Sequence, residues 1–465
     1  MEYDAEMIAC LSRQLVETFV AALARHSQAS DNAMTIADIE TEFRELLRQT
    51  GAQALSLYLS SEGTPVTEIR CECGGILHYQ RQRCAIITSV FGRITYERAY
   101  YAGCTCGHGK APRDEQYGLE PGAMSSGLAA LLGLAGVEFG FDRSRAWLQR
   151  FLLFDVSENT VRSETQTFGA LQAEREQALC QQSRDEEYLQ ARLRDTAPTP
   201  TRLYGSLDAA KVRIEPRARA GKKPETAEDW RDMKVGCWYE AESVPLAQRS
   251  VRQQDKFERE QAVQRAKNIR YYCDIIEAEA FGNLLWGTGC AVKADLASEL
   301  VFVCDGATWI WNLVTFHYPK AVQIVDWYHA EDRLKRIAHA AFSRECERGQ
   351  WLAQATTDLW EGRVESVIRA CEQLASRCEE AQDAVTYFTN NRHRMRYDQF
   401  RTAGYMIGSG TVESGCKQVV TQRLKLPGAQ WNVPGAAHTG KARAAWLSGE
   451  WDALCARRAA LPLTA

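Results

Sequence analysis

The chain has 465 residues, and its 56 lysines and arginines against 60 aspartates and glutamates give a formal net charge of −4 at pH 7. A chain of this length exceeds what one hydrophobic core supports, so we expect about three domains. The sequence has no run of about 18 apolar residues, which argues against a membrane-spanning helix. Its acidic start lacks the basic and then apolar order of a signal peptide, and we expect a cytoplasmic protein.

Residues 1–65 predict helices. Met7, Leu11, Leu15 and Phe19 recur at helical spacing, and the same period returns between 36 and 57. Because this region contains no residue pattern that indicates chemistry, we expect its helices to serve packing or self-association.

Residues 66–118 predict a small β module with a metal site. Two strands, 85–91 and 94–101, flank a turn at Gly92-Arg93, and each end of the module holds a Cys-x-Cys-Gly sequence. Tetrahedral zinc binds four soft ligands, so the pattern favours a zinc-ribbon-like site at Cys71, Cys73, Cys104 and Cys106. The pairs are one residue tighter than the usual Cys-x-x-Cys, so Cys84 or His108 could replace one ligand. The alternative is a metal-free β module.

Residues 119–198 predict a helical region that resembles a helix-turn-helix. Ser157 is a suitable N-cap for a long second helix. Its first exposed positions, Asn159, Thr160 and Arg162, could contact base edges or phosphates of DNA. A helical hairpin with a purely structural role gives the same pattern.

Residues 199–329 predict a sheet, with strands near 202–212, 231–240, 267–274, 299–305 and 321–326. Apolar runs lead directly into Asp208, Asp305 and Asp326. Since ligands collect at the carboxyl ends of parallel strands, these carboxylates should face one crevice. A further acid, Glu413, lies in a Gly-Ser-Gly sequence before the last helical segment, after a helical stretch at 330–403.

Three carboxylates in one crevice favour a divalent cation. Asp208, Asp305 and Glu413 could hold Mg²⁺ or Mn²⁺, which prefer oxygen ligands and phosphodiester substrates. For any single aspartate at a strand end, a role as helix cap or turn residue is the commoner case. The order of two strand acids followed by an acid on a late helix fits a ribonuclease-H-like sheet with an insertion.

Basic residues surround these acids in the sequence. One group runs from Lys211 to Lys223, and a second flanks Glu413. Such groups favour binding of a polyanion, although a solvated basic surface is an equally good interpretation of each group alone. The predicted DNA contacts of the second group are Arg394, Arg396, Lys417, Arg423 and Lys425.

Several blocks resemble a known family. Leu203 to Asp208, Asp305 to Asn312, Asp326-Trp-Tyr-His329 and Ile407 to Glu413 are similar to the conserved blocks of bacterial insertion-sequence DDE transposases of the Kra type, which are related to the Mutator and hAT groups. The resemblance covers about 65–455. In this chain, Ala209-Ala210 stand where the family usually has glycine, which implies a tighter backbone approach to the metal site.

The resemblance implies both an activity and a set of site residues. Asp208, Asp305 and Glu413 would bind Mg²⁺, and His329 would contact the scissile strand or position a carboxylate, with a hydrogen-bonded core histidine as the alternative. Asp326 would orient His329 instead of binding metal. The activity would be cleavage at transposon ends and transfer of the freed 3′-hydroxyl groups to target DNA.

The predicted fold is a multidomain α+β protein. It has N-terminal helices (1–65), a small zinc-ribbon-like β module (66–118), a helix-turn-helix-like DNA-binding region (119–198), a ribonuclease-H-like α/β catalytic core (199–329), an all-helical insertion (330–403) and a C-terminal catalytic helix and tail (404–465).

The expected partners are double-stranded DNA, as transposon ends and as target, and further copies of the chain. We expect the protein in the cytoplasm, associated with the nucleoid when it binds DNA. A DNA-binding regulator or domesticated relative without strand transfer is the alternative function. A structure-specific nuclease on the same sheet is a third.

Overall fold

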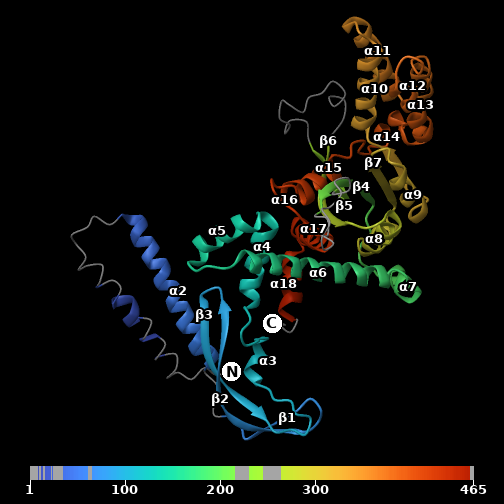
Figure 1. The fold of residues 1–465 in the computed structure, drawn as a ribbon. Helices are drawn as coiled ribbons and strands as arrows, with labels where there is room; N and C mark the ends of the chain where they lie inside the picture. The colour runs from blue at the N-terminus through green and yellow to red at the C-terminus, as the bar shows by residue number, and fades with distance from the viewer. Residues whose placement is uncertain are drawn as a thin grey trace, which may run out of the picture. The chain divides into compact units, whose positions relative to one another are not determined.

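In a computed structural model of the chain, the described residues are 35–60, 65–214, 230–244 and 263–460, with positions 9, 12–13, 16–21 and 24 (Figure 1). Met7, Leu11 and Leu15 of the predicted first helix lie outside them, as do residues 215–223 of the first basic group. The chain divides into two units, Met1–Phe168 with Asp452–Ala465, and Gly169–Trp451. No helix in the described part of the chain is both long enough and apolar enough to span a membrane.

The first unit contains a three-stranded antiparallel sheet in the order β1-β2-β3. The strands are β1 (Glu68–Arg70), β2 (Ile76–Ser89) and β3 (Gly92–Ala102), and helix α2 (Ile36–Ser60) packs on β3. Buried and exposed residues alternate along β3, as the period of a strand with one covered face requires. The predicted turn at Gly92-Arg93 is wrong by two residues. Ser89 pairs with Gly92, so the turn is Val90-Phe91 and Gly92 begins β3.

Helices follow the sheet in the first unit. They are α3 (Pro112–Tyr117), α4 (Ser126–Glu138), α5 (Phe141–Leu152), the start of α6 (Glu158–Gln182) and α18 (Trp451–Ala460). The predicted N-cap at Ser157 is confirmed, because its hydroxyl accepts a hydrogen bond from the Thr160 N–H at 3.0 Å. The α4 and α6 backbones approach closely, since a Cβ on Gly136 would lie 1.9 Å from the Thr165 hydroxyl.

The second unit is built on a five-stranded mixed sheet in the order β6-β5-β4-β7-β8. The strands are β4 (Arg202–Arg213), β5 (Trp230–Val244), β6 (Val263–Asp274), β7 (Glu299–Cys304) and β8 (Val322–Val325). Numbered along the chain from one to five, they lie in the order 3-2-1-4-5. β4, β5 and β6 are antiparallel to one another, and β7 and β8 run parallel to β4.

One strand end differs from the prediction. Asp208 does not end its strand, because β4 continues beside β5 as far as Arg213↔Trp230. Pairing of β4 with β7, in contrast, stops at Gly205↔Phe302. Asp208 therefore lies where the parallel neighbour ends, while its own strand runs on.

Helices precede, connect and follow these strands. They are α7 (Glu186–Arg194), α8 (Ala278–Ala291), α9 (Thr308–His317), α10 (Trp327–Ala341), α11 (Glu345–Trp360), α12 (Val364–Glu372), α13 (Glu379–Asn391), α14 (Tyr397–Thr402), α15 (Gly410–Gly415), α16 (Gln422–Leu424) and α17 (Val433–Leu447). Among them α10 to α13 pack on one another as a helical group (Figure 1). A π-helical turn, η6 (Cys416–Thr421), follows α15 directly.

A buried ion cluster joins α6 and α17 to β6. Lys441 on α17 contacts the Glu176 carboxylate and lies 2.9 Å from the Asp274 carboxylate. Lys441 and Glu176 have side chains only 4% and 3% exposed. Opposite charges removed from water must pair closely, so the cluster fixes how these three elements meet.

Candidate active site and four-cysteine centre

Asp208 and Asp305 belong to neighbouring parallel strands. The last printed pair between β4 and β7 is Gly205↔Phe302, and continuing this register by three residues brings Asp208 beside Asp305. The two carboxyl groups also interact electrostatically, because the Asp208 charge raises the pKa of Asp305. The structure therefore brings the first two predicted acids together.

The Asp305 carboxyl group is in an environment that disfavours its charge. Burial, followed by the charge of Asp208, raises its pKa above the usual value, while a hydrogen bond from the Ala307 N–H at 3.0 Å opposes the rise. That hydrogen bond forms a turn before α9, so Asp305 also has the role of a turn residue. A cation between the two carboxylates would remove their mutual repulsion.

Asp326 is fully buried, with 0% exposure, at the start of α10. One oxygen accepts from the His329 N–H at 2.7 Å as the helix N-cap, and the other accepts from the Ser409 N–H. Burial alone would raise the pKa of Asp326, but the His329 ring and these N–H groups outweigh it and hold the pKa below its usual value. With both oxygens used internally, Asp326 is suited to positioning His329.

His329 lies between two carboxylates. Its Nδ1 atom is 3.1 Å from Asp326 and 3.5 Å from Glu413. The hydrogen bond to Asp326 raises the pKa of His329 to about 9, burial opposes this, and the charges of Asp326, Glu413 and Asp305 add to the rise. His329 is half exposed, so the alternative of a core histidine does not describe it.

Glu413 is exposed on α15, and its carboxylate accepts a hydrogen bond from the Ser409 hydroxyl at 3.1 Å. The ligand atoms of Asp326, His329 and Glu413 all lie within 4.8 Å of one another. Three residues further on, burial and the nearby Asp208 carboxylate raise the pKa of the Cys416 thiol. The segment that carries Glu413 therefore adjoins both His329 and Asp208.

These interactions link the predicted acids in one site. Asp208 adjoins Asp305, Asp305 interacts with His329, and His329 lies beside Glu413. The tight group with His329 and Glu413 contains Asp326, however, and not the two strand aspartates. The local π-helix after Glu413 is also notable, since such turns are frequent at functional sites.

Two residues at this site were not predicted from the sequence. Ser409 donates to Glu413 through its hydroxyl and to Asp326 through its backbone, and its position four residues before Glu413 is a usable signal. Arg333 lies one helical turn after His329 and its charge lowers the pKa of Asp305. The spacing of four residues from His329 would have placed it on the same helix face.

The predicted DNA-contacting cations differ in exposure. Arg396, Lys417 and Lys425 are exposed. Arg394 donates to Gln323 and stacks 4.7 Å from the Trp311 ring, so its guanidinium is already engaged. The predicted DNA contact of Arg423 is wrong. Its side chain is 1% exposed, because packing near the Trp431 ring covers it, and this position is unsuited to a phosphate contact.

The start of α6 presents the predicted helix-turn-helix residues. Asn159 is exposed, and Thr160 and Arg162 are partly exposed. The Arg162 guanidinium donates to the Asn159 side chain at 3.0 Å and to Glu158 at 2.7 Å. A DNA contact by Arg162 would therefore have to compete with Glu158.

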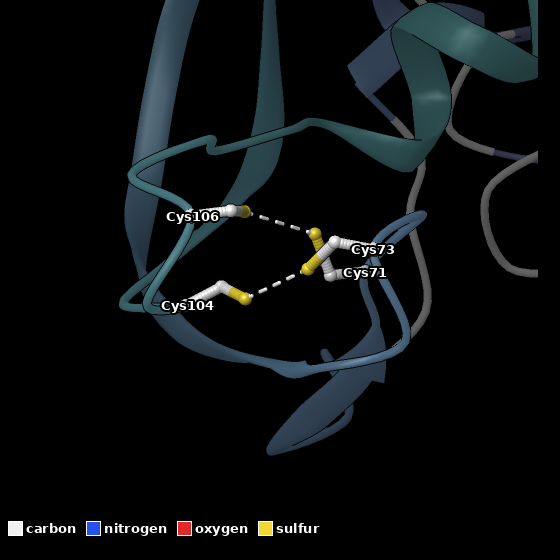
Figure 2. A group of neighbouring side chains, drawn as sticks. All are labelled: Cys71, Cys73, Cys104 and Cys106. Atoms are coloured by element: carbon white, nitrogen blue, oxygen red, sulfur yellow. Dashed lines mark hydrogen bonds between the residues drawn. The ribbon is translucent and has the colours of Figure 1, made fainter.

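The four predicted cysteines of the first unit lie together (Figure 2). Their sulfur atoms are all within 4.8 Å of one another. The Cys71 and Cys106 sulfurs are 3.5 Å apart, and those of Cys73 and Cys104 are 3.3 Å apart. A tetrahedral zinc site with Zn–S bonds of about 2.3 Å has sulfurs about 3.8 Å apart, so these four thiols fit zinc.

The two cysteine turns have the same geometry. The Gly74 N–H donates to the Cys71 carbonyl and the Gly107 N–H to the Cys104 carbonyl, each at 3.0 Å. Both glycines have left-handed φ angles, 89° and 78°, which glycine adopts without strain. The tighter Cys-x-Cys spacing thus still closes into matching turns.

The proposed substitute ligands do not join this group. Among the described residues, the group of metal-binding atoms contains neither Cys84 nor His108. The Cys84 thiol instead contacts the Glu97 carboxylate across the hairpin at 3.7 Å. The backbone N–H of Cys106, followed by neighbouring thiols, lowers the pKa of Cys104 to about 6, whereas neighbouring thiols raise the pKa of Cys73 and of Cys106 against the effect of backbone N–H groups. Within the group, Cys104 therefore most readily forms the thiolate that metals bind.

A separate cavity of about 650 Å³ in the second unit lies near the start of β4 and is lined by Leu203, Trp238 and Arg270. None of the candidate acids lines it. Its Glu450 side chain is already paired with Arg175 and Arg270 at 2.6 Å each.

The chain resembles a solved structure weakly and matches no family model. No family model and no curated protein matches the chain. Among solved structures, it is similar to one described as the Drosophila P element transposase strand transfer complex, with 10% sequence identity and a TM-score of 0.25 over 74% of this chain and 83% of that chain. These values are too low to assign a shared activity.

Proposed function

We propose that this chain is a DDE transposase, which binds the terminal inverted repeats of an insertion sequence and performs Mg²⁺-dependent DNA cleavage and strand transfer. The observation that carries the proposal is the series of neighbouring charges from Asp208 through Asp305 and His329 to Glu413: Asp305 interacts electrostatically with Asp208 and with His329, and His329 lies 3.5 Å from Glu413. The strand order 3-2-1-4-5, with acids where the first and fourth strands lie side by side, supports a ribonuclease-H-like core. The resemblance of the sequence blocks to the Kra-type family supports the same function.

The donor set suits a hard divalent cation. Asp208, Asp305 and Glu413 offer carboxylate oxygens, which Mg²⁺ and Mn²⁺ prefer. A cation bound there would oppose burial and the Asp208 charge, which raise the pKa of Asp305. When bound there, the metal would activate the attacking oxygen and stabilise the leaving oxygen of a phosphodiester.

The reaction has two balanced steps. In cleavage, a water oxygen bonds to phosphorus and loses a proton, while the bond to the 3′-oxygen breaks and that oxygen becomes a hydroxyl group. In strand transfer, this 3′-hydroxyl oxygen bonds to a phosphorus of target DNA and loses its proton, and the displaced target 3′-oxygen gains one. Each step exchanges one bond for another, so neither needs a co-reactant other than the water that cleavage consumes.

His329 has a positioning role in this proposal. It is a cation at neutral pH, held by Asp326, and it lies 3.5 Å from the Glu413 carboxylate. It can therefore fix the orientation of Glu413 and offset negative charge when a DNA strand approaches the carboxylates.

DNA ends would be recognised elsewhere on the chain. The four-cysteine module, proposed to hold zinc, and the start of α6 are the candidate surfaces, and Arg396, Lys417 and Lys425 are exposed cations in the unit that holds the acids. We propose that the protein acts as a homo-oligomer on paired ends and that it associates with the nucleoid.

Asp305→Asn tests the function. The probes are linear duplexes of the DNA that flanks the coding region, incubated with the full chain in Mg²⁺ or in EDTA. We expect the parent protein to cut these duplexes only with Mg²⁺, and Asp305→Asn to lose cutting while it retains binding. The control is Asp332→Asn, an exposed acid on α10, which should behave as the parent. Cutting by Asp305→Asn at the parental rate, or equal loss of binding and cutting, would refute the assignment.

A further inference from the structure

Arg333 is held over an aromatic ring beside the candidate site. It lies on α10 one turn after His329, and its guanidinium carbon is 3.9 Å from the centre of the Tyr387 ring on α13. At this distance a guanidinium stacks on the ring face, which fixes its plane and leaves its edge N–H groups available as donors. The two helices pack directly on each other.

The Tyr387 ring itself is fixed against the turn that carries Asp305. A Cβ on Gly306 would lie 2.0 Å from a carbon of the Tyr387 ring, so only glycine allows the ring to approach this closely. Tyr387 is 9% exposed, and its backbone carbonyl accepts from the Asn391 side chain at 3.0 Å. The ring therefore connects the helical group α10 to α13 with the Asp305 turn.

The charge of Arg333 acts on Asp305. It lowers the pKa of that carboxyl group, in opposition to the effects of burial and of Asp208. In the described part of the chain, no carboxylate oxygen forms an ion pair with the Arg333 guanidinium within 4.0 Å. Arg336 on the same helix, in contrast, pairs with Asp332 at 3.4 Å. Arg333 thus has a fixed guanidinium at an acidic site without a close carboxylate partner.

We propose that Arg333 binds the non-bridging oxygens of the scissile phosphate and that Tyr387 positions it. This inference rests on the proposed function and adds the group that recognises the reacting phosphate. The planar guanidinium offers two parallel N–H donors, which match two phosphate oxygens. A phosphate brought to the carboxylates would meet the side chains of His329 and Arg333, which lie on adjacent turns of α10.

The proposal also assigns a role to the helical group. Its α13 supplies Tyr387, so α10 to α13 complete the phosphate-binding side of the site. A lysine at 333 would keep the charge but lose the planar stack, so it should not replace arginine fully.

The experiment measures single-turnover cutting of the flanking-DNA duplexes in Mg²⁺ with excess protein. We expect Arg333→Gln to slow cutting about 100-fold, as for loss of one donor to a transition-state charge. Affinity for the duplex in Ca²⁺ should change little. Arg333→Lys should fall between the parent and Arg333→Gln. The matched control Arg336→Gln should cut at the parental rate.

A second substrate separates phosphate binding from folding. With a methylphosphonate at the scissile position, one charged oxygen is gone, so Arg333→Gln should slow cutting much less than it does on ordinary DNA. Tyr387→Phe should retain the stack and the cutting rate, whereas Tyr387→Leu should slow cutting. The double variant Tyr387→Leu with Arg333→Gln should cut little more slowly than Arg333→Gln alone. An equal loss of cutting rate by Arg333→Gln on both substrates, or cutting by Arg333→Gln at the parental rate, would overturn the inference. If the parent protein does not cut at all, it is the proposed function that fails.

Discussion

Replacing Asp326 by asparagine removes one negative charge from a fully buried position while it keeps the side-chain shape. In the parent, one carboxylate oxygen accepts from the His329 N–H at 2.7 Å, and the other accepts from the Ser409 N–H. An asparagine has one oxygen and one NH₂ group. Whichever way the amide turns, its NH₂ group therefore faces a backbone N–H that can no longer be satisfied.

The cost follows from these contacts. A hydrogen bond to a charged group contributes about 1.5–3 kcal/mol, and a buried N–H without an acceptor costs about 1–3 kcal/mol. The substitution also removes the carboxylate that lies 3.1 Å from the His329 ring. We expect the free energy of local opening around Asp326 to fall by about 3 kcal/mol, which is roughly a 100-fold change in the opening equilibrium.

Hydrogen exchange of the His329 and Ser409 amides measures this opening directly, because both N–H groups donate to Asp326. Mass spectrometry of peptides that cover these amides should show about 100-fold faster exchange in Asp326→Asn than in the parent. Asp332→Asn is the control, since its carboxylate is 62% exposed on the same helix. An acceleration below about tenfold would refute the positioning role of Asp326.

Three further predictions concern metal, packing and pH. Freshly purified protein should contain zinc, and Cys104→Ser should lose it whereas Cys84→Ser should not; a zinc-free parent protein would remove the site. Lys441→Met should lower the free energy of unfolding in urea by about 3–5 kcal/mol, because it leaves the buried Glu176 carboxylate without a cation. The ion pair of Lys335 with Glu331 on α10, whose lysine side chain is 46% exposed, should contribute under about 1 kcal/mol. The pKa of His329 is raised from 6.5 to about 9, so in EDTA its stabilising contribution should be complete below pH 6.5 and vanish as the pH rises through 9. The difference in Tm between the parent and His329→Gln should shrink over that range, and a constant difference would contradict this.

Local patterns in the sequence determined the elements. The strands of the second unit lie close to the predicted ranges, the Ser157 cap forms as predicted, and the four cysteines meet. Each of these depends on short-range properties. Alternating or continuous apolar residues set strand periods, a hydroxyl satisfies the first N–H groups of a helix, and two turns with glycine present thiols in the same way.

Exposure, in contrast, was decided by residues distant in the chain. Nothing near Arg423 in the sequence separates it from Lys425, yet the first is buried and the second is exposed. Arg394 is engaged by Gln323 and Trp311, which lie on other elements. A basic run predicts charge but not whether a neighbouring aromatic ring will cover it.

The grouping at the acidic site likewise depends on the tertiary structure. The sequence placed carboxylates after apolar runs, but the partner of Asp208 follows from the register of β4 with β7, and β4 itself continues because β5 pairs with it. The position of Arg333 follows from a tyrosine more than fifty residues away, packed on Gly306. Period and caps are encoded within a few residues, whereas the distance between two charges is set by how whole elements pack, and only the folded chain determines it.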